Sequence, residues 1–188
     1  MAYFYCTRNP TEPQRADPQE IMNCILKQLS SATSDLPIRT PVSKMYQIRK
    51  QEADDDGCEP LRLTTMECVN LILELLEVDP AFIIIDALDE CNPLLRHELL
   101  EALDMIISRS ANLAKVVVSS RDDNDIVCRL QMSPNIFISA RDNGQDIRRF
   151  ISSEVERSIH QKYLLADEVS HTLQRKIVTT LINNAHGM

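Results

Sequence analysis

Three acidic side chains stand directly after an apolar run, in the segment FIIIDALDEC that begins at Phe82. The run ends at Asp86, and Asp89 and Glu90 follow it closely. An aspartate at the end of a strand can hold Mg²⁺ through water, and a second acid can orient or deprotonate an attacking water molecule. The segment therefore suggests a site for phosphate chemistry, with Asp86 at the metal ion and Asp89 and Glu90 at the water.

A cation for the same chemistry ends a second apolar segment, KVVVSSR, which runs from Lys115 to Arg121. The planar guanidinium group can bind two phosphate oxygens at once, a geometry that lysine cannot copy. A purely structural role explains the same residues equally well, because the acids could cap the following helix and Arg121 could pair with them. The residues by themselves leave both interpretations open.

Strands that alternate with helices must position these side chains. The isoleucines at 83–85 show no alternation with polar residues, which predicts a strand buried on both faces, and 115–120 predicts another such strand. Further strands are predicted at 2–6 and 135–139. Strands joined by helical crossovers indicate an α/β fold, a parallel sheet covered by helices on both faces. Ligands of such sheets bind at the carboxyl ends of the strands, where the acids and Arg121 stand.

Helix signals lie between the strands. Asp17 with Glu20, and Thr64 with Glu67, have the spacing of capping boxes. The remaining predictions are a short polar helix at 43–52, a solvated acidic loop at 54–56, a helix that starts at Asn92-Pro93, apolar helical stripes from 147 to 159 and from 169 to 182, and Gly187 as the last helix cap.

Composition excludes several classes of function. The 188 residues carry a net charge of -8, so no basic field exists to bind nucleic acid. The six cysteines contain no CxxC and the four histidines are scattered, which indicates reduced thiols of a cytoplasmic protein and no zinc site. No apolar run approaches the roughly 18 residues of a membrane span, so a membrane is not an expected partner. Nucleic acid is not an expected partner either, because of the negative net charge.

FIIIDALDEC, followed one helix later by KVVVSSR, resembles the Walker B and sensor strands of NACHT-type (STAND) P-loop NTPases. In particular, the chain resembles the nephrocystin-3-like N-terminal NTPase domain of large fungal proteins that carry ankyrin or other repeats. Residues 2–30 resemble the second strand of that domain and its helix, and 135–155 resemble its fifth strand and helix. The closing NNAHGM resembles the start of a further motif of the family.

The resemblance implies a three-layer, P-loop NTPase-like core over 1–160 and the start of a helical region over 161–188. It assigns Asp86 to Mg²⁺, Asp89 and Glu90 to the catalytic water, and Arg121 to the sensor position. It also implies a signalling switch, in which binding and hydrolysis of ATP or GTP control the assembly of an oligomer, as in fungal non-self recognition.

The sequence departs from the family in one large respect. The family's first strand and its GxxGxGK[ST] loop should precede Ala2, and none of the three glycines precedes Lys-Ser or Lys-Thr. Backbone N–H groups and the lysine of that loop hold the phosphates. The chain is therefore expected to be a fragment of a nucleoside-triphosphatase that is inactive by itself and binds no nucleotide tightly.

The missing strand also has a consequence for assembly. The family's strand order is 5-1-4-3-2, so the first strand belongs between 135–139 and 115–120. Its loss leaves unpaired backbone groups inside the sheet, which predicts poor folding, self-association or pairing with related NACHT proteins.

Two other classes of function stay open. One is a non-enzymatic interaction remnant that pairs with related full-length proteins. The other is an unrelated hydrolase with an acid pair, which would need a second carboxylate or a histidine to converge on Asp86, and no feature of the sequence identifies one.

Overall fold

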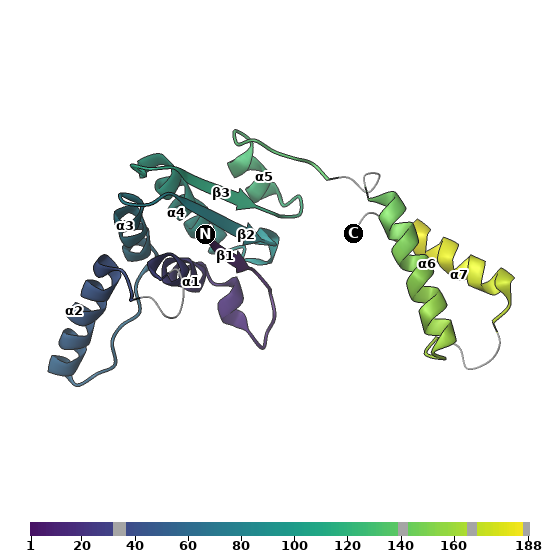
Figure 1. The fold of residues 1–188 in the computed structure, drawn as a ribbon, viewed down its shortest axis with the longest axis horizontal. Helices are drawn as coiled ribbons and strands as arrows, with labels where there is room; N and C mark the ends of the chain where they lie inside the picture. The colour runs from purple at the N-terminus through teal and green to yellow at the C-terminus, as the bar shows by residue number, and fades with distance from the viewer. Residues whose placement is uncertain (32–36, 139–142, 165–168, 186–188) are drawn as a thin grey trace. The chain divides into compact units, whose positions relative to one another are not determined.

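The computed structural model describes residues 1–31, 37–138, 143–164 and 169–185. The chain forms two compact units, Met1–Met132 and Ser133–Met188, which are drawn in Figure 1. The predicted division into domains at 1–160 and 161–188 stays a prediction. Among the helices in the described ranges, none combines the length and the hydropathy that a bilayer crossing requires.

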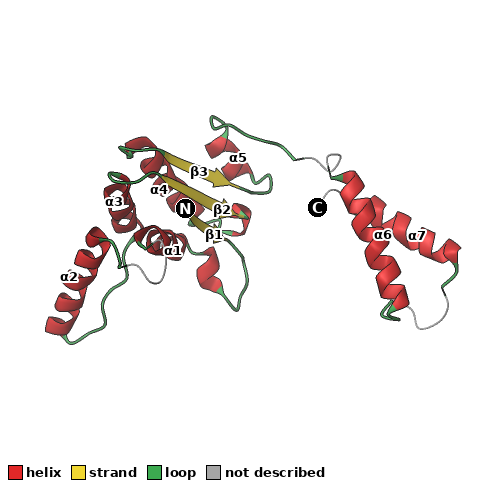
Figure 2. Cartoon of the chain, viewed as in Figure 1, coloured by secondary structure: helices red, strands yellow, loops and turns green. Residues whose placement is uncertain are grey.

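The first unit contains three strands and the helices that connect them (Figure 2). The strands are β1 (Ala2–Tyr5), β2 (Ala81–Asp86) and β3 (Ala114–Val118). The helices are η1 (Pro13–Ala16), α1 (Pro18–Ser30), α2 (Thr40–Asp56), α3 (Thr65–Leu76), η2 (Leu88–Glu90), α4 (Arg96–Arg109) and α5 (Asn124–Leu130), where η marks a 3₁₀ turn. The second unit contains α6 (Gly144–His160) and α7 (His171–Asn184), which pack against each other.

The three strands form one parallel sheet in the order β1-β2-β3. Tyr5 pairs with Asp86 in the register of β1 and β2, and Ile85 pairs with Val118 in that of β2 and β3. The parallel sheet with helical crossovers confirms the α/β class. The order also agrees with the adjacency expected for strands 2, 3 and 4 of the family, and it brings the carboxyl ends of all three strands to one edge.

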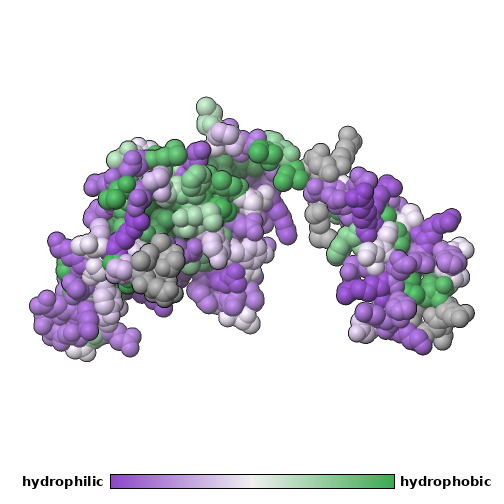
Figure 3. Space-filling model, viewed as in Figure 1, coloured by the Kyte–Doolittle hydropathy of each residue, from purple (hydrophilic) through white to green (hydrophobic). Residues whose placement is uncertain are grey.

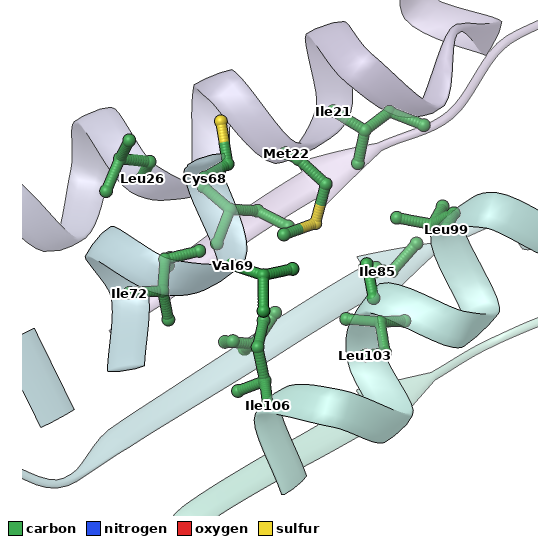
Figure 4. Packing of buried hydrophobic residues seen from close by; sticks show 14 of the residues in the cluster. Ile21, Met22, Leu26, Cys68, Val69, Ile72, Ile85, Leu99, Leu103 and Ile106 are labelled. Atoms are coloured by element: carbon green, nitrogen blue, oxygen red, sulfur yellow. The ribbon is translucent and has the colours of Figure 1, made fainter. Parts of the chain in front are cut away.

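The core lies between one face of the sheet and helices α1, α3 and α4 (Figure 4). Each helix contributes fully buried apolar side chains, and β2 contributes Ile83 and Ile85. The helix residues that Figure 4 labels are Ile21, Met22 and Leu26 of α1, Cys68, Val69 and Ile72 of α3, and Leu99, Leu103 and Ile106 of α4. This layer fixes the strand ends that carry the acids.

The other face of the sheet is exposed, which corrects the prediction that the strands at 83–85 and 115–120 are buried on both faces. Burial alternates along β2, and Phe82 is 46% exposed between buried neighbours. Tyr3 of β1 and Val117 of β3 are exposed on the same face, being 64% and 57% accessible. Figure 3 shows apolar residues over this part of the first unit. A run of isoleucines is compatible with a strand buried on one face or on both faces. The run shows that the strand is hydrophobic, but it does not show which elements pack on each face.

The strand predicted at 135–139 is not formed by its described residues. Residues 135–138 have no strand pairing, and Ile136 is 92% exposed. The last position, Ser139, lies outside the described residues. A segment of strand-forming residues becomes a strand only where its backbone pairs with a neighbouring strand, and residues 135–138 make no such pairing.

Both predicted capping residues cap their helices, and one of the two predicted capping boxes is complete. The capping box of Thr64 and Glu67 is confirmed at α3. Asp17 caps α1 by accepting from the N–H of Gln19 at 2.9 Å, but Glu20 pairs with Arg62 and does not complete a capping box.

Three helix boundaries differ from the prediction. The helix predicted at 43–52 already begins at Thr40. The acidic residues 54–56 form the last turn of α2 and are not a loop, because the helix continues to Gly57, whose φ of 67° ends it. The helix predicted from Asn92 begins at Arg96. The predicted cap Gly187 lies outside the described residues, as do positions 139–142 and 186–188 of the segments that resemble the family.

Candidate functional site at the carboxyl edge of the sheet

Three loops meet at the carboxyl edge, one after each strand. They surround a hollow of about 360 Å³. Its lining consists of Tyr5, Thr7, Ala87, Asp89, Glu90, Ser119, Ser120 and Arg121. Three of the four predicted site residues, Asp89, Glu90 and Arg121, therefore lie around one space, although the sequence separates the acids from the arginine by a whole helix.

Asp86, the predicted metal ligand, lies beside this hollow and is not part of its lining. It is the last residue of β2 and its side chain is exposed. Its Oδ1 accepts a hydrogen bond from the hydroxyl of Ser119, and its carbonyl oxygen accepts one from the N–H of Cys6 at 2.9 Å. Asp86 therefore links the end of β2 by hydrogen bonds to the residues that follow β1 and β3.

Ala87 reverses the chain after β2. It has φ 55° and ψ 51°, a left-handed conformation that non-glycine residues rarely adopt. The 3₁₀ turn η2 follows, and Leu88 anchors it by complete burial. The N–H of Leu88 also donates to the carbonyl oxygen of Ser119 at 2.9 Å. This kink turns Asp89 and Glu90 back towards the hollow.

Asp89 is bound on both carboxylate oxygens by Arg121. Oδ1 accepts from the backbone N–H of Arg121 at 3.1 Å, and Oδ2 lies 3.6 Å from Nε of its guanidinium group. Asp89 is buried, whereas the side chain of Arg121 is 83% exposed. The structural pairing that the sequence left open is therefore present, and it leaves most of the guanidinium accessible to an anion.

Glu90 faces the loop after β1. Its Oε2 accepts a hydrogen bond from the N–H of Arg8 at 3.2 Å. The other carboxylate oxygen takes no part in that bond. Glu90 is therefore the acid of the turn that is better placed to act on water, while Asp89 mainly holds the loop after β3.

The site offers a magnesium ion one carboxylate at the end of a strand, that of Asp86, and no complete set of protein ligands within the described residues. In the described part of the chain, no three side chains of the types His, Cys, Asp or Glu converge as metal ligands. Mg²⁺ usually keeps several waters and takes only one or two protein carboxylates, with phosphate oxygens completing its shell. Asp86 fits that limited role, and it fits no all-protein metal site.

Two buried thiols beside the site are not nucleophiles. Burial, with smaller effects of Cys91, Asp86 and Asp89, raises the pKa of Cys6 to about 12. Burial raises the pKa of Cys91 to about 11, although the charge of Arg96 opposes the shift. Both thiols stay protonated near neutral pH, and only the thiolate is reactive.

Two arginines of the site were missed by the sequence analysis. Arg8 and Arg96 both donate to the carbonyl oxygen of Asp89, at 2.6 Å and 3.0 Å. Nothing in the sequence marks Arg8. Arg96 could have been found, because it lies three and seven residues before Leu99 and Leu103 and so falls on the buried face of its helix.

The fold and the site together define a class, a parallel α/β domain with an acidic turn and an exposed arginine at the carboxyl edge of its sheet. The sequence profile of the family "Nephrocystin 3, N-terminal" matches residues 1–121, which is more than half of the chain and includes every predicted site residue. The chain belongs to this family. Comparisons with curated proteins and with solved structures found no match.

Proposed function

We propose that this chain carries the metal and water side of a NACHT-type nucleotide-binding switch. One observation carries the proposal: Asp89, Glu90 and Arg121 surround a single hollow, with Asp86 beside it at the end of β2. Acids and an arginine at the carboxyl edge of a parallel sheet are the groups that phosphate transfer requires. Membership of the nephrocystin 3 N-terminal family supports the same function.

Each residue has a role in the proposal. Asp86 holds a water-coordinated Mg²⁺, which when bound neutralises phosphate charge. Glu90 accepts a proton from the attacking water or orients it, and Asp89 supports it by holding the loop of Arg121. The exposed guanidinium of Arg121 binds phosphate oxygens.

The phosphate-binding loop is the part that this sequence does not supply. No GxxxxGK[ST] occurs among the 188 residues, so the proposal places the glycine-rich loop elsewhere in the complete site. The ligand is ATP or GTP with Mg²⁺, the location is the cytoplasm, and the partners are further copies or related NACHT proteins in a signalling oligomer. The chain alone should bind nucleotide weakly, because each charge-assisted bond to phosphate is worth about 1.5–3 kcal/mol and several are missing.

Two variants test the proposal in a form of the protein that includes a phosphate-binding loop before Ala2. Glu90→Gln should preserve nucleotide binding and slow hydrolysis at least about 100-fold, because it removes the proton acceptor but keeps the shape. Asp86→Asn should raise the Mg²⁺ concentration needed for half-maximal hydrolysis. Glu74→Gln, an exposed glutamate on α3, is the matched control and should change neither.

The result that would overturn the proposal is wild-type hydrolysis in both site variants. Calorimetry on the 188-residue chain gives an independent check. Low-micromolar binding of Mg-ATP or Mg-GTP to that chain would show that the phosphates are held by residues other than the expected loop.

A further inference from the structure

Arg96, the first residue of α4, bridges two loops of the site from inside the protein. Its side chain is 0% exposed. On one side, Nη2 donates to the carbonyl oxygens of Asp89 at 3.0 Å and Cys91 at 3.4 Å, in the turn after β2. On the other side, Nη1 donates at 3.0 Å to carboxylate oxygens of Asp123 and Asp125, in the segment after β3.

Arg121 stands between these two attachments. Its N–H donates to the carboxylate of Asp89, and its carbonyl oxygen accepts from the N–H of Asp123 at 2.9 Å. Arg96 binds the backbone of Asp89 and the side chain of Asp123 at the same time. One guanidinium group therefore binds two of the residues that hydrogen-bond to the backbone of Arg121.

Stability alone does not account for this arginine. Removing a charged group from water is costly, and well-packed apolar side chains often replace buried ion pairs without loss of stability. The Nε of Arg96 is in addition buried without a hydrogen-bond partner among the described residues. A side chain that binds two loops at once needs donors that point in different directions. The planar guanidinium group of arginine has such donors, whereas lysine and apolar side chains do not.

We propose that Arg96 is a positioning residue that sets the placement of Arg121 relative to the acidic turn. The catalytic role of Arg96 rests on the proposed function. In that function Arg96 sets the distance between Glu90, which acts on the water, and Arg121, which binds the phosphate. The positioning itself does not depend on nucleotide.

Arg8 provides a matched control. Its Nη2 binds the same two carbonyl oxygens, of Asp89 at 2.6 Å and Cys91 at 3.2 Å, but it comes from the loop after β1 and its side chain is exposed. Within the part of the chain that the structure describes, the hydrogen bonds of Arg8 reach the turn after β2 and not the segment after β3. Loss of Arg8 should therefore loosen the acidic turn and leave the attachment of Asp123 intact.

Amide hydrogen exchange, resolved by residue with mass spectrometry, tests the proposal on the 188-residue chain, whether monomeric or self-associated. Arg96→Met should speed exchange of the Arg121 N–H about tenfold or more, while the N–H groups of Ile83 and Ile85 in β2 keep their protection. Arg96→Lys should speed exchange of the Arg121 N–H as well, because lysine cannot bind both loops as the guanidinium group does. Arg8→Met should change Arg121 less than threefold.

A second variant keeps the test decisive if Arg96→Met does not fold. Asp123→Asn with Asp125→Asn changes only partly exposed carboxylates and keeps an acceptor oxygen at each position, and it should also speed exchange at Arg121. Unchanged exchange at Arg121, or equal acceleration at Arg121 and in β2, would reduce Arg96 to a purely structural role.

Kinetics of the protein with its phosphate-binding loop separate this proposal from the proposed function. Arg96→Met should lower kcat and leave nucleotide affinity within about twofold. If the wild-type protein hydrolyses no nucleotide, the proposed function fails, and the exchange result still decides the role of Arg96.

Discussion

The hydroxyl group of Ser119 donates a hydrogen bond to Oδ1 of Asp86 and accepts one from the N–H of Ala87 at 3.0 Å. One side chain at the end of β3 therefore holds both the last residue of β2 and the left-handed residue that follows it. The geometry of the acidic turn depends on this contact between strands.

Ser119→Ala should lower the free energy of unfolding by about 1 kcal/mol, because it removes two hydrogen bonds at a partly solvated position. Urea unfolding at neutral pH measures the change. Ser120→Ala is the neighbouring control, since the hydroxyl group of Ser120 donates to the carbonyl oxygen of Arg121 in its own loop. If both variants lose the same free energy of unfolding, the hydrogen bonds of Ser119 to Asp86 and Ala87 add no stability beyond that of an ordinary loop hydroxyl.

Ala87→Gly should leave stability unchanged or raise it by up to about 1.6 kcal/mol. A left-handed conformation costs an alanine about 1–2 kcal/mol, and glycine offsets part of that relief by about 0.4–1 kcal/mol of additional freedom in the unfolded chain. Ala87→Val should destabilise the protein, because a β-branched residue tolerates positive φ poorly. Thermal unfolding of both variants checks the signs, and destabilisation by glycine would argue against the left-handed turn.

The chain should self-associate at micromolar concentration through its exposed sheet. Tyr3, Phe82 and Val117 leave an apolar sheet face in water, and β3 has no partner on one side among the described strands. Val117→Lys should shift sedimentation towards the monomer. Val127→Lys on α5, where the side chain is 45% exposed, is the control and should have little effect. A wild-type chain that sediments as a single monomer would refute this prediction.

Stability should fall as the pH rises above about 9, the range in which thiols of the unfolded chain lose their protons. Burial raises the pKa of Cys6 and of Cys68 to about 12 each and that of Cys91 to about 11, so the folded protein keeps protons that the unfolded chain releases. Their stabilising contribution is complete below pH 9 and is lost as the pH approaches 11 to 12.

Urea unfolding at pH 8, 9 and 10 measures this loss, which is at most about 1.4 kcal/mol per pH unit for each thiol. Cys68 is the useful test because it lies in the core and away from the candidate site. Cys68→Ala should reduce the slope, and Cys58→Ala, at an exposed position, should not. A stability that does not change between pH 8 and pH 10 would contradict the prediction.

Local signals in the sequence were enough to predict the α/β class, the strands that end at Asp86 and before Arg121, and the capping box at Thr64. These features depend on local signals: an apolar run followed by acids marks a strand end, and Thr64 with Glu67 satisfies the backbone groups of one helical turn. The parallel arrangement also follows from local information, because helices between strands leave few other connections.

The contacts of each site residue could not be predicted from the sequence, because they depend on how distant segments pack. The exposed face of β2, the absence of a strand at 135–138 and the clamp of Arg96 all depend on groups far apart in the sequence. A run of isoleucines carries no information on what covers it, and a strand-like segment pairs only if a free strand lies beside it. Asp89 and Arg121 meet for the same reason: parallel pairing of β2 with β3 brings two strand ends together, and hydrogen bonds at that edge then decide which acid is bound and which faces water.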